Sequence, residues 1–321
     1  MILPMKKLTD TEKRILVKIA KMYYFEELTQ QEIANFFDIS RSKVSRSLTQ
    51  AKEQGIVHIY IDDEFSEEQL LEKSLRNKFG VHEVCVVNET ASNPEALYHQ
   101  MGGVLTRILD NKLRDGDTLG LTAGFTLNNI CGSMGTVVRK NLHIVPLIGG
   151  IGVEGAPWQI NQAMMVFSEK LKADYFVMNA PSYCSSETAR EILLNEPEIR
   201  RVLDMIRKCS VAVVGIGEIS ESATLLSTNC MHPEDIQELE AKHTAAIIGT
   251  NFFDRDGKLI DAAISKRTIG ATIQDLRTIP NVIAVAHGVQ KATAIMSALR
   301  SGLVNILITD IETAKLIDQG S

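Results

Sequence analysis

Apolar residues recur at three- and four-residue spacings through the first 54 residues of the chain. The stretch "LTDTEKRILVKIAKMYYFEE" places Ile15, Ile19 and Tyr23 on one face, which predicts an amphipathic helix. Thr9 and Glu12 have the spacing of a capping box, so this helix is expected to begin beside them.

Two shorter helices are predicted next, separated by "DIS". Thr29 and Glu32 have the capping-box spacing at the start of the first, and Ser40 is suited to be the N-cap of the second. Gly55 stands where a glycine would end that second helix. Its predicted inner face consists of Val44, Leu48 and Ala51.

Beyond residue 64 the pattern changes. A predicted connecting helix over 64–79 leads into apolar runs that alternate with helical stretches, an order typical of a parallel sheet covered by helices. The predicted strands are "VHEVCVV", "DTLGLTAG", "LHIVPLIGG", "ADYFVMNAP", "SVAVVGIG", "TAAIIGTNFF", "NVIAVAHG" and "VNILITD".

These patterns predict an α/β protein with a small helical domain at its N-terminus. Residues 1–61 would form a helix-turn-helix domain, winged-helix-like because "IVHIYID" alternates as a short strand does. Residues 62–80 would form the connecting helix, and residues 81–321 one large Rossmann-like α/β domain for a ligand.

Charge separates the two ends of the chain. Residues 1–61 carry a balance of +3 within a net charge of −6, so the remainder carries −9. A basic end on an acidic body fits a head that binds a polyanion, although +3 by itself is weak support.

Composition is that of an ordinary soluble protein, with 45% hydrophobic and 23% charged residues. The sequence has no long uncharged apolar run and no signal-peptide pattern, so no membrane partner is expected and the protein is expected to be cytoplasmic. Its five cysteines form no CxxC pair and are expected to be free thiols. No metal and no cofactor is predicted.

The third predicted helix carries the candidate DNA-reading residues at its start. In a helix-turn-helix, the N-terminal residues of the second helix reach base edges, while the start of the preceding helix can hold a phosphate. The alternative is a solvated polar face, but short serines would let this helix approach a surface closely. The predicted DNA-binding residues are Gln30, Gln31, Ser40, Arg41, Ser42, Lys43, Ser45 and Arg46.

Loops that follow apolar strands carry the candidate ligand residues, because open parallel sheets bind ligands at the carboxyl ends of their strands. In "GLTAGFTLNNI", residues Thr122, Ala123, Gly124, Phe125 and Thr126 could form an anion site, with Thr126 as the cap of a helix. An ordinary strand–turn–helix corner explains this loop equally well.

A lysine marks a second loop. In "VAHGVQKATAIMSALRSG" the helix should begin near Gln290, which puts Lys291 in a first turn that disfavours a cation. A bound anion would account for it, and a surface lysine is the alternative. In "NFFDRDGKLID", Asp254 could bond sugar hydroxyls or only form a turn, whereas Asp256 and Gly257 are expected to form a turn. The stretch "LIGGIGVEGAPWQINQAM" suits the rim of a polar-ligand pocket.

Taken together, the motifs resemble the SorC family of bacterial transcriptional regulators, and the resemblance covers nearly the whole chain. The segments that carry it are "YYFEELTQQEIANFFDISRSKVSRSLTQAKEQGIVHIYI", "GDTLGLTAGFTL", "IVPLIGGIG", "NAPSYCSSETARE", "VVGIGEI", "NFFDRDG" and "VIAVAHGVQKATAIMSALRSGLVNILITD".

The resemblance implies an effector domain similar to sugar-phosphate isomerases that binds a sugar or sugar phosphate without converting it. Thr122, Gly124, Thr126 and Lys291 would hold a phosphate. Asn161 and Asp254 would lie nearer the sugar, and Gly149 and Gly150 are also predicted to bind the effector. Phe125 departs from the family, in which many members carry a small or hydroxyl residue at this position.

We therefore expect a DNA-binding transcriptional regulator of a carbohydrate-utilisation operon, controlled by a sugar or sugar-phosphate effector. It would be a homo-oligomer, dimer or tetramer, because helix-turn-helix readers commonly pair two half-sites. An active isomerase fused to a DNA-binding head is the alternative, and it would need an acid–base pair that the sequence does not display. A head that binds another protein is a third possibility.

Overall fold

The computed structural model describes residues 10–54, 56–57, 66–152, 159–219 and 230–320. The chain forms two compact units, residues 1–62 and 63–321, which are described separately. The predicted caps Thr9 and Gly55 and the predicted strand "IVHIYID", apart from its first two residues, lie outside the described residues.

The first unit contains three helices, α1 (Asp10–Tyr24), α2 (Gln30–Phe37) and α3 (Arg41–Glu53). Glu32 and Thr29 close the predicted capping box at the start of α2. Asp38 then takes a left-handed conformation with φ of 52°, and this single residue turns the chain between α2 and α3. The small core that unites the three helices consists of Ile19, Met22, Ile33, Ala34, Val44 and Leu48.

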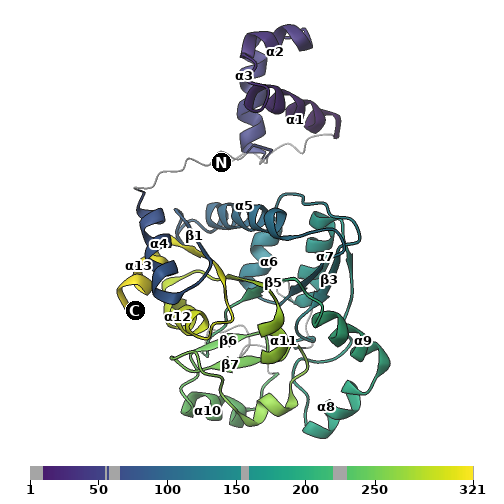
Figure 1. Cartoon of the computed structure of the whole chain (residues 1–321), viewed down its shortest axis with the longest axis vertical. Coiled ribbons are helices and arrows are strands. Elements are labelled where there is room, and N and C mark those ends of the chain that lie inside the picture. Colours follow the sequence, from purple (N-terminus) through teal and green to yellow (C-terminus); the bar gives the residue numbers. More distant parts are fainter. Residues whose placement is uncertain (1–9, 55, 58–65, 153–158, 220–229, 321) are drawn as a thin grey trace. The chain divides into compact units, whose positions relative to one another are not determined.

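The second unit is an α/β domain around one seven-stranded sheet (Figure 1). The strand order is β1-β9-β8-β5-β2-β3-β4, and every neighbouring pair is parallel. The strands are β1 (Glu83–Val87), β2 (Thr118–Leu121), β3 (His143–Pro146), β4 (Asp174–Tyr175), β5 (Val211–Gly215), β8 (Asn281–Val285) and β9 (Ile306–Asp310).

Helices cover both faces of this sheet. Alternate strand residues point to opposite faces, as Val213 and Val214 of β5 do by joining two different cores. On one face lie α5 (Pro94–Lys112), α6 (Phe125–Cys131) and α7 (Ile160–Leu171), and on the other α4 (Glu67–Phe79), α9 (Pro197–Ile206), α12 (Ala292–Arg300) and α13 (Ile311–Gly320). Burial on both faces explains why the strands read as continuous apolar runs.

A smaller substructure accompanies the sheet and has its own core. It includes α10 (Pro233–Ala241), the 3₁₀ turn η2 (Ala263–Arg267) and the strands β6 (Ala246–Ile248) and β7 (Asn251–Phe253). Helices α8 (Glu187–Leu194) and α11 (Ile273–Thr278) pack against the larger core that also contains α9 and α12. The stretch "TAAIIGTNFF", which we predicted as one strand, is instead the antiparallel hairpin β6–β7, outside the main sheet. Gly249, with φ of 62°, makes the two-residue turn possible between two equally apolar halves.

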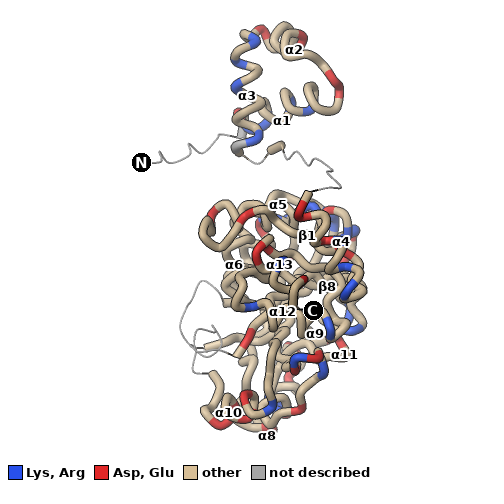
Figure 2. The backbone as a smooth tube through the Cα atoms, turned by 90° about the vertical axis from the view of Figure 1, so that its left-hand side faces the viewer, with Lys and Arg blue, Asp and Glu red and all other residues tan. Residues whose placement is uncertain are grey.

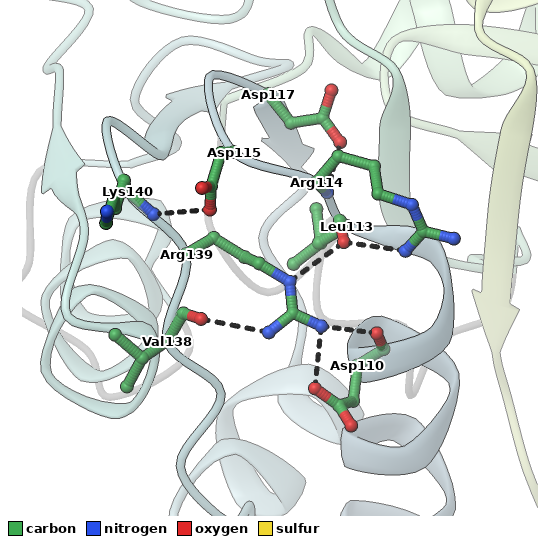
Figure 3. Close-up of polar contacts among 8 residues, drawn as sticks. All are labelled: Asp110, Leu113, Arg114, Asp115, Asp117, Val138, Arg139 and Lys140. Atoms are coloured by element: carbon green, nitrogen blue, oxygen red, sulfur yellow. Dashed lines mark hydrogen bonds and ion pairs between the residues drawn. The ribbon is translucent and has the colours of Figure 1, made fainter.

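A charged cluster fixes the amino-terminal edge of β2 and β3 (Figure 3). Arg139 donates hydrogen bonds to two backbone carbonyls, that of Asp110 in the last turn of α5 and that of Leu113, the residue that follows the helix. It also pairs with the Asp110 carboxylate at 2.7 Å. The Asp115 carboxylate accepts from the backbone N–H of Lys140 at 2.8 Å. Because these contacts satisfy the orphan carbonyls at the end of α5, they hold the strands whose other ends carry the predicted ligand loops.

Candidate functional site

The N-terminal unit presents one polar face on α3. Ser40 caps the helix as predicted, because its Oγ accepts a hydrogen bond from the backbone N–H of Lys43 at 3.3 Å. Val44 and Leu48 are buried toward α1 and α2. The residues left exposed on the first turns are Arg41, Ser42, Lys43, Ser45 and Arg46, and Figure 2 shows the basic positions along α3.

This face has the geometry of a DNA-reading helix. Three cationic side chains project from the first two turns of a helix that follows a tight turn. Of the two glutamines that open α2, Gln31 is exposed and donates to Asn35 Oδ1 at 3.0 Å, while Gln30 is half-buried. The arrangement can therefore place arginine forks at base edges and the start of α2 near a phosphate.

In the second unit, the predicted ligand loops meet at the carboxyl end of β5. The Thr122 Oγ1 accepts a hydrogen bond from the backbone N–H of Gly215 at 3.0 Å. From the other neighbour of β5, the Lys291 Nζ donates to the backbone carbonyl of Ile216 at 3.1 Å. The loops after β2 and β8 thus contact the last residue of β5 and the residue that follows it, and β5 lies between β2 and β8 in the sheet.

The loop after β2 differs in one respect from our prediction. Thr126 does not cap α6, because the helix begins at Phe125, two residues earlier than a Thr126 cap would require, and Gly124 occupies the N-cap position. Gly124 has φ of 156° and ψ of 151°, a region that only glycine enters readily. Thr126 is buried, whereas Phe125 is 58% exposed, so an aromatic side chain faces solvent beside this loop.

Lys291 lies at the start of α12, where we predicted it, with the short 3₁₀ turn η3 (Val289–Lys291) before it. Burial lowers the pKa of its ammonium, and Glu218 opposes that shift. Within the described residues, Lys291 forms no salt bridge. A half-buried cation with one carbonyl as its hydrogen-bond partner retains donors for an anion.

Sequence reasoning missed His287, which stands between β8 and Lys291. Its ring contacts the Tyr98 ring edge-on, with centroids 5.4 Å apart, and its buried Nδ1 has no hydrogen-bond partner among the described residues. Burial lowers the pKa of His287, while Asp310 raises it and Lys291 lowers it further. The signal that could have identified it was a histidine at the end of the apolar run "NVIAVAHG".

The glycines after β3 lie beside these loops. A Cβ at Gly149 would stand 2.4 Å from the Ala180 carbonyl oxygen, so Gly149 permits close packing of two backbones. Gly150 donates to that same carbonyl at 2.8 Å and has more space around it. Asn161 is exposed in the first turn of α7.

The structure does not bring Asp254 to this edge. Gly249, at the turn of the β6–β7 hairpin, is the end that approaches Thr122, and Asp254 follows β7 at the opposite, open end. Its Oδ1 accepts hydrogen bonds from the backbone N–H groups of Asp256 and Lys258, both at 2.9 Å. The Asp254 carboxylate therefore stabilises a turn, which is the alternative role that the sequence also allowed.

Comparisons with known proteins show which family the chain resembles. Residues 63–317 match the family described as "Putative sugar-binding domain", and residues 5–54 match sigma-70 region 4. The sorbitol operon regulator of Klebsiella pneumoniae is 30% identical over 308 residues, which cover 95% of this chain and 97% of the relative. The deoxyribonucleoside regulator of Bacillus subtilis is 29% identical over 309 residues, covering 96% and 98%.

A solved structure shows the same architecture over the whole length. The full-length sorbitol operon regulator SorC from Klebsiella pneumoniae superposes with a TM-score of 0.80 at 28% identity, covering 97% of this chain and 100% of that one. In the described ranges, no helix is both long and apolar enough to cross a bilayer.

A helix-turn-helix head and a helix-covered parallel sheet with ligand loops at one edge define a DNA-binding transcriptional regulator with a sugar-binding domain. The chain belongs to the SorC family of such regulators.

Proposed function

We propose that a sugar or sugar phosphate binds at the carboxyl ends of β2, β5 and β8 and thereby sets the affinity of the protein for its operator. The convergence of Thr122 and Lys291 on Gly215 and Ile216 carries this proposal. It places a hydroxyl and a half-buried ammonium at the edge where open parallel sheets bind ligands. An anionic group of the ligand would bind Lys291, and its hydroxyl groups would reach Asn161 and donate to the backbone carbonyls of Gly149 and Gly150, whose N–H groups are already bonded.

The names of the relatives support a carbohydrate effector. One is named a sorbitol operon regulator and another a deoxyribonucleoside regulator. Both names point to polyhydroxylated molecules, which need several neutral hydrogen-bonding groups besides any phosphate site. We propose the same chemical class for this chain, in a carbohydrate-utilisation operon.

On the DNA side, we propose that Arg41, Ser42, Lys43, Ser45 and Arg46 read base edges, with Ser40, Gln30 and Gln31 beside the phosphates. A single short helix covers only one half-site, so a homo-oligomer, dimer or tetramer, would pair two. We further propose that the protein binds its ligand without converting it and acts in the cytoplasm.

One experiment tests the site directly. Titration calorimetry of the purified chain with sugars and sugar phosphates chosen by a thermal-shift screen should give binding that Lys291→Met weakens. Recovery of the sugar unchanged after prolonged incubation, measured by NMR, would support binding without catalysis, whereas turnover would revive the isomerase alternative. A ligand that binds Lys291→Met as tightly as the wild type would contradict the proposed site.

A further inference from the structure

A cavity lies beside the β6–β7 hairpin, apart from the loops discussed above. It has a volume of about 220 Å³. None of the predicted effector residues lines it. The polar residues of its wall include Arg190, Thr250, Asn251, Ser265, Thr272 and Gln274.

Two of these side chains are more than nine-tenths buried and have unused hydrogen-bonding capacity. Thr250 is 6% exposed, and its hydroxyl makes no hydrogen bond with any described residue. Asn251 is 9% exposed and donates through Nδ2 to the carbonyls of Ile248 and Ala271, at 3.3 and 3.0 Å. Because both amide donors are used, the amide orientation is fixed and its Oδ1 remains as an acceptor.

A guanidinium completes the wall. The Arg190 Nε donates to the backbone carbonyl of Thr268 at 2.7 Å, which holds the side chain in place. Its terminal nitrogens form no ion pair within the described residues. Of the two acids in this region, Asp275 pairs with Arg207 at 3.4 Å, and Asp261 lines the cavity but is exposed to solvent.

We propose that this cavity is a second small-molecule site, which takes a hydroxylated anion such as an aldonate or a polyol phosphate. The guanidinium fork suits a carboxylate or a phosphate. The Asn251 Oδ1 accepts a hydrogen bond from a ligand hydroxyl, and the Thr250 hydroxyl can donate or accept. Thr250 and Asn251 both line the cavity, so a ligand there can form hydrogen bonds with these two groups.

The cavity wall is bonded to the predicted effector loops. Ala271 donates from its backbone to the Leu147 carbonyl at 2.7 Å, and Gly149 donates to the Ile269 carbonyl at 3.3 Å. Thr250 follows Gly249, the residue that approaches Thr122. A molecule in the cavity therefore contacts the segments that support the loops after β2 and β3, which gives it a route to modulate effector binding.

Titration calorimetry of the full chain with three probes tests the assignment. The probes are D-gluconate, D-glucitol 6-phosphate and neutral D-glucitol, which differ in the anionic group. The wild type should bind at least one of the two anions, and glucitol at least about tenfold more weakly, because it lacks the charge. Binding of gluconate would identify a carboxylate as the preferred anionic group, and binding of glucitol 6-phosphate would identify a phosphate. Absence of binding by both anions at millimolar concentration would overturn the proposal.

Variants locate the binding. Thr250→Val keeps the volume and removes only the hydroxyl, so affinity should fall about five- to tenfold while folding is preserved. Arg190→Gln should reduce it at least about tenfold. Lys291→Met, at the other site, should leave it within about twofold of the wild type. If Lys291→Met abolishes the binding and Thr250→Val does not change it, the anion occupies the first site and the second-site proposal is wrong.

Discussion

The Lys291 ammonium donates a hydrogen bond across the sheet edge to the backbone carbonyl of Ile216, 3.1 Å away. The two residues follow neighbouring strands, β8 and β5, and are 75 positions apart in the chain. Burial lowers the pKa of this lysine, so its charge is less favourable in the folded protein than in water. A cation held under such a penalty is well placed to gain from an anionic ligand.

Lys291→Met should reduce affinity for an anionic effector while DNA binding without effector is retained. The loss should be about 1.5–3 kcal/mol, the usual contribution of a hydrogen bond to a charged group. Calorimetry and a DNA mobility shift measure the two quantities. Lys258→Met, which removes a charge from the remote turn at Asp254, is the matched control and should change neither. Equal losses in both variants would contradict a specific role.

Effector binding should depend on pH in a direction that Lys291 determines. Its folded pKa is lowered, so charging it costs stability at low pH, and this cost disappears as pH rises through the folded pKa toward the unfolded value. A bound anion reverses the penalty and raises the pKa. Affinity should therefore fall as pH rises through the folded pKa, and binding should take up a proton in that window. Calorimetry in buffers of different ionisation enthalpy checks this, and Lys291→Met should lack the uptake.

Arg41→Ala should weaken operator binding and relax base preference at one position by about 1–3 kcal/mol, as expected for a bidentate arginine–guanine contact. Lys52→Ala removes the same charge from the last turn of α3 and serves as control. It should weaken binding less and equally for all sequences. Mobility shifts with base-substituted operators at several salt concentrations measure both effects. An identical response of the two variants would indicate a purely electrostatic face.

Gly149→Ala should destabilise the second unit, whereas Gly150→Ala should be tolerated better. The new Cβ at position 149 would meet three backbone atoms within 2.8 Å, but at position 150 the nearest atom is 3.9 Å away. Overpacking of this kind costs about 1–3 kcal/mol. Urea unfolding followed by circular dichroism compares the two free energies of unfolding. Equal values would show that the backbone at Gly149 can move away.

Much of the architecture could be predicted from local patterns. Thr29, Glu32 and Ser40 act within three residues of themselves, so their caps were visible in the sequence and are confirmed. Six strands of the sheet are buried and appear in the sequence as apolar runs, whereas β4 consists of two exposed residues at the end of the strand order. The hairpin at Gly249 was not predicted, because the apolar pattern continues on both sides of its turn.

The site was harder to predict because it depends on distant contacts. Thr126 has the chemistry of a cap, yet Gly124 takes that position because the loop needs a backbone conformation that threonine cannot adopt. Asp254 was predicted as a possible sugar ligand, but its carboxylate bonds within a turn at the open end of the hairpin. The approach of Lys291 to Ile216 follows from strand order, which no local pattern encodes.

The central claim is that the sugar site and the DNA face are coupled. The most direct test measures the dissociation constant for DNA upstream of the protein's own operon, with and without a saturating sugar identified by thermal shift. The account predicts a change of about 5- to 150-fold in either direction, and the same factor when sugar affinity is measured with and without DNA. An unchanged operator affinity at a sugar concentration that fully occupies the protein would contradict it.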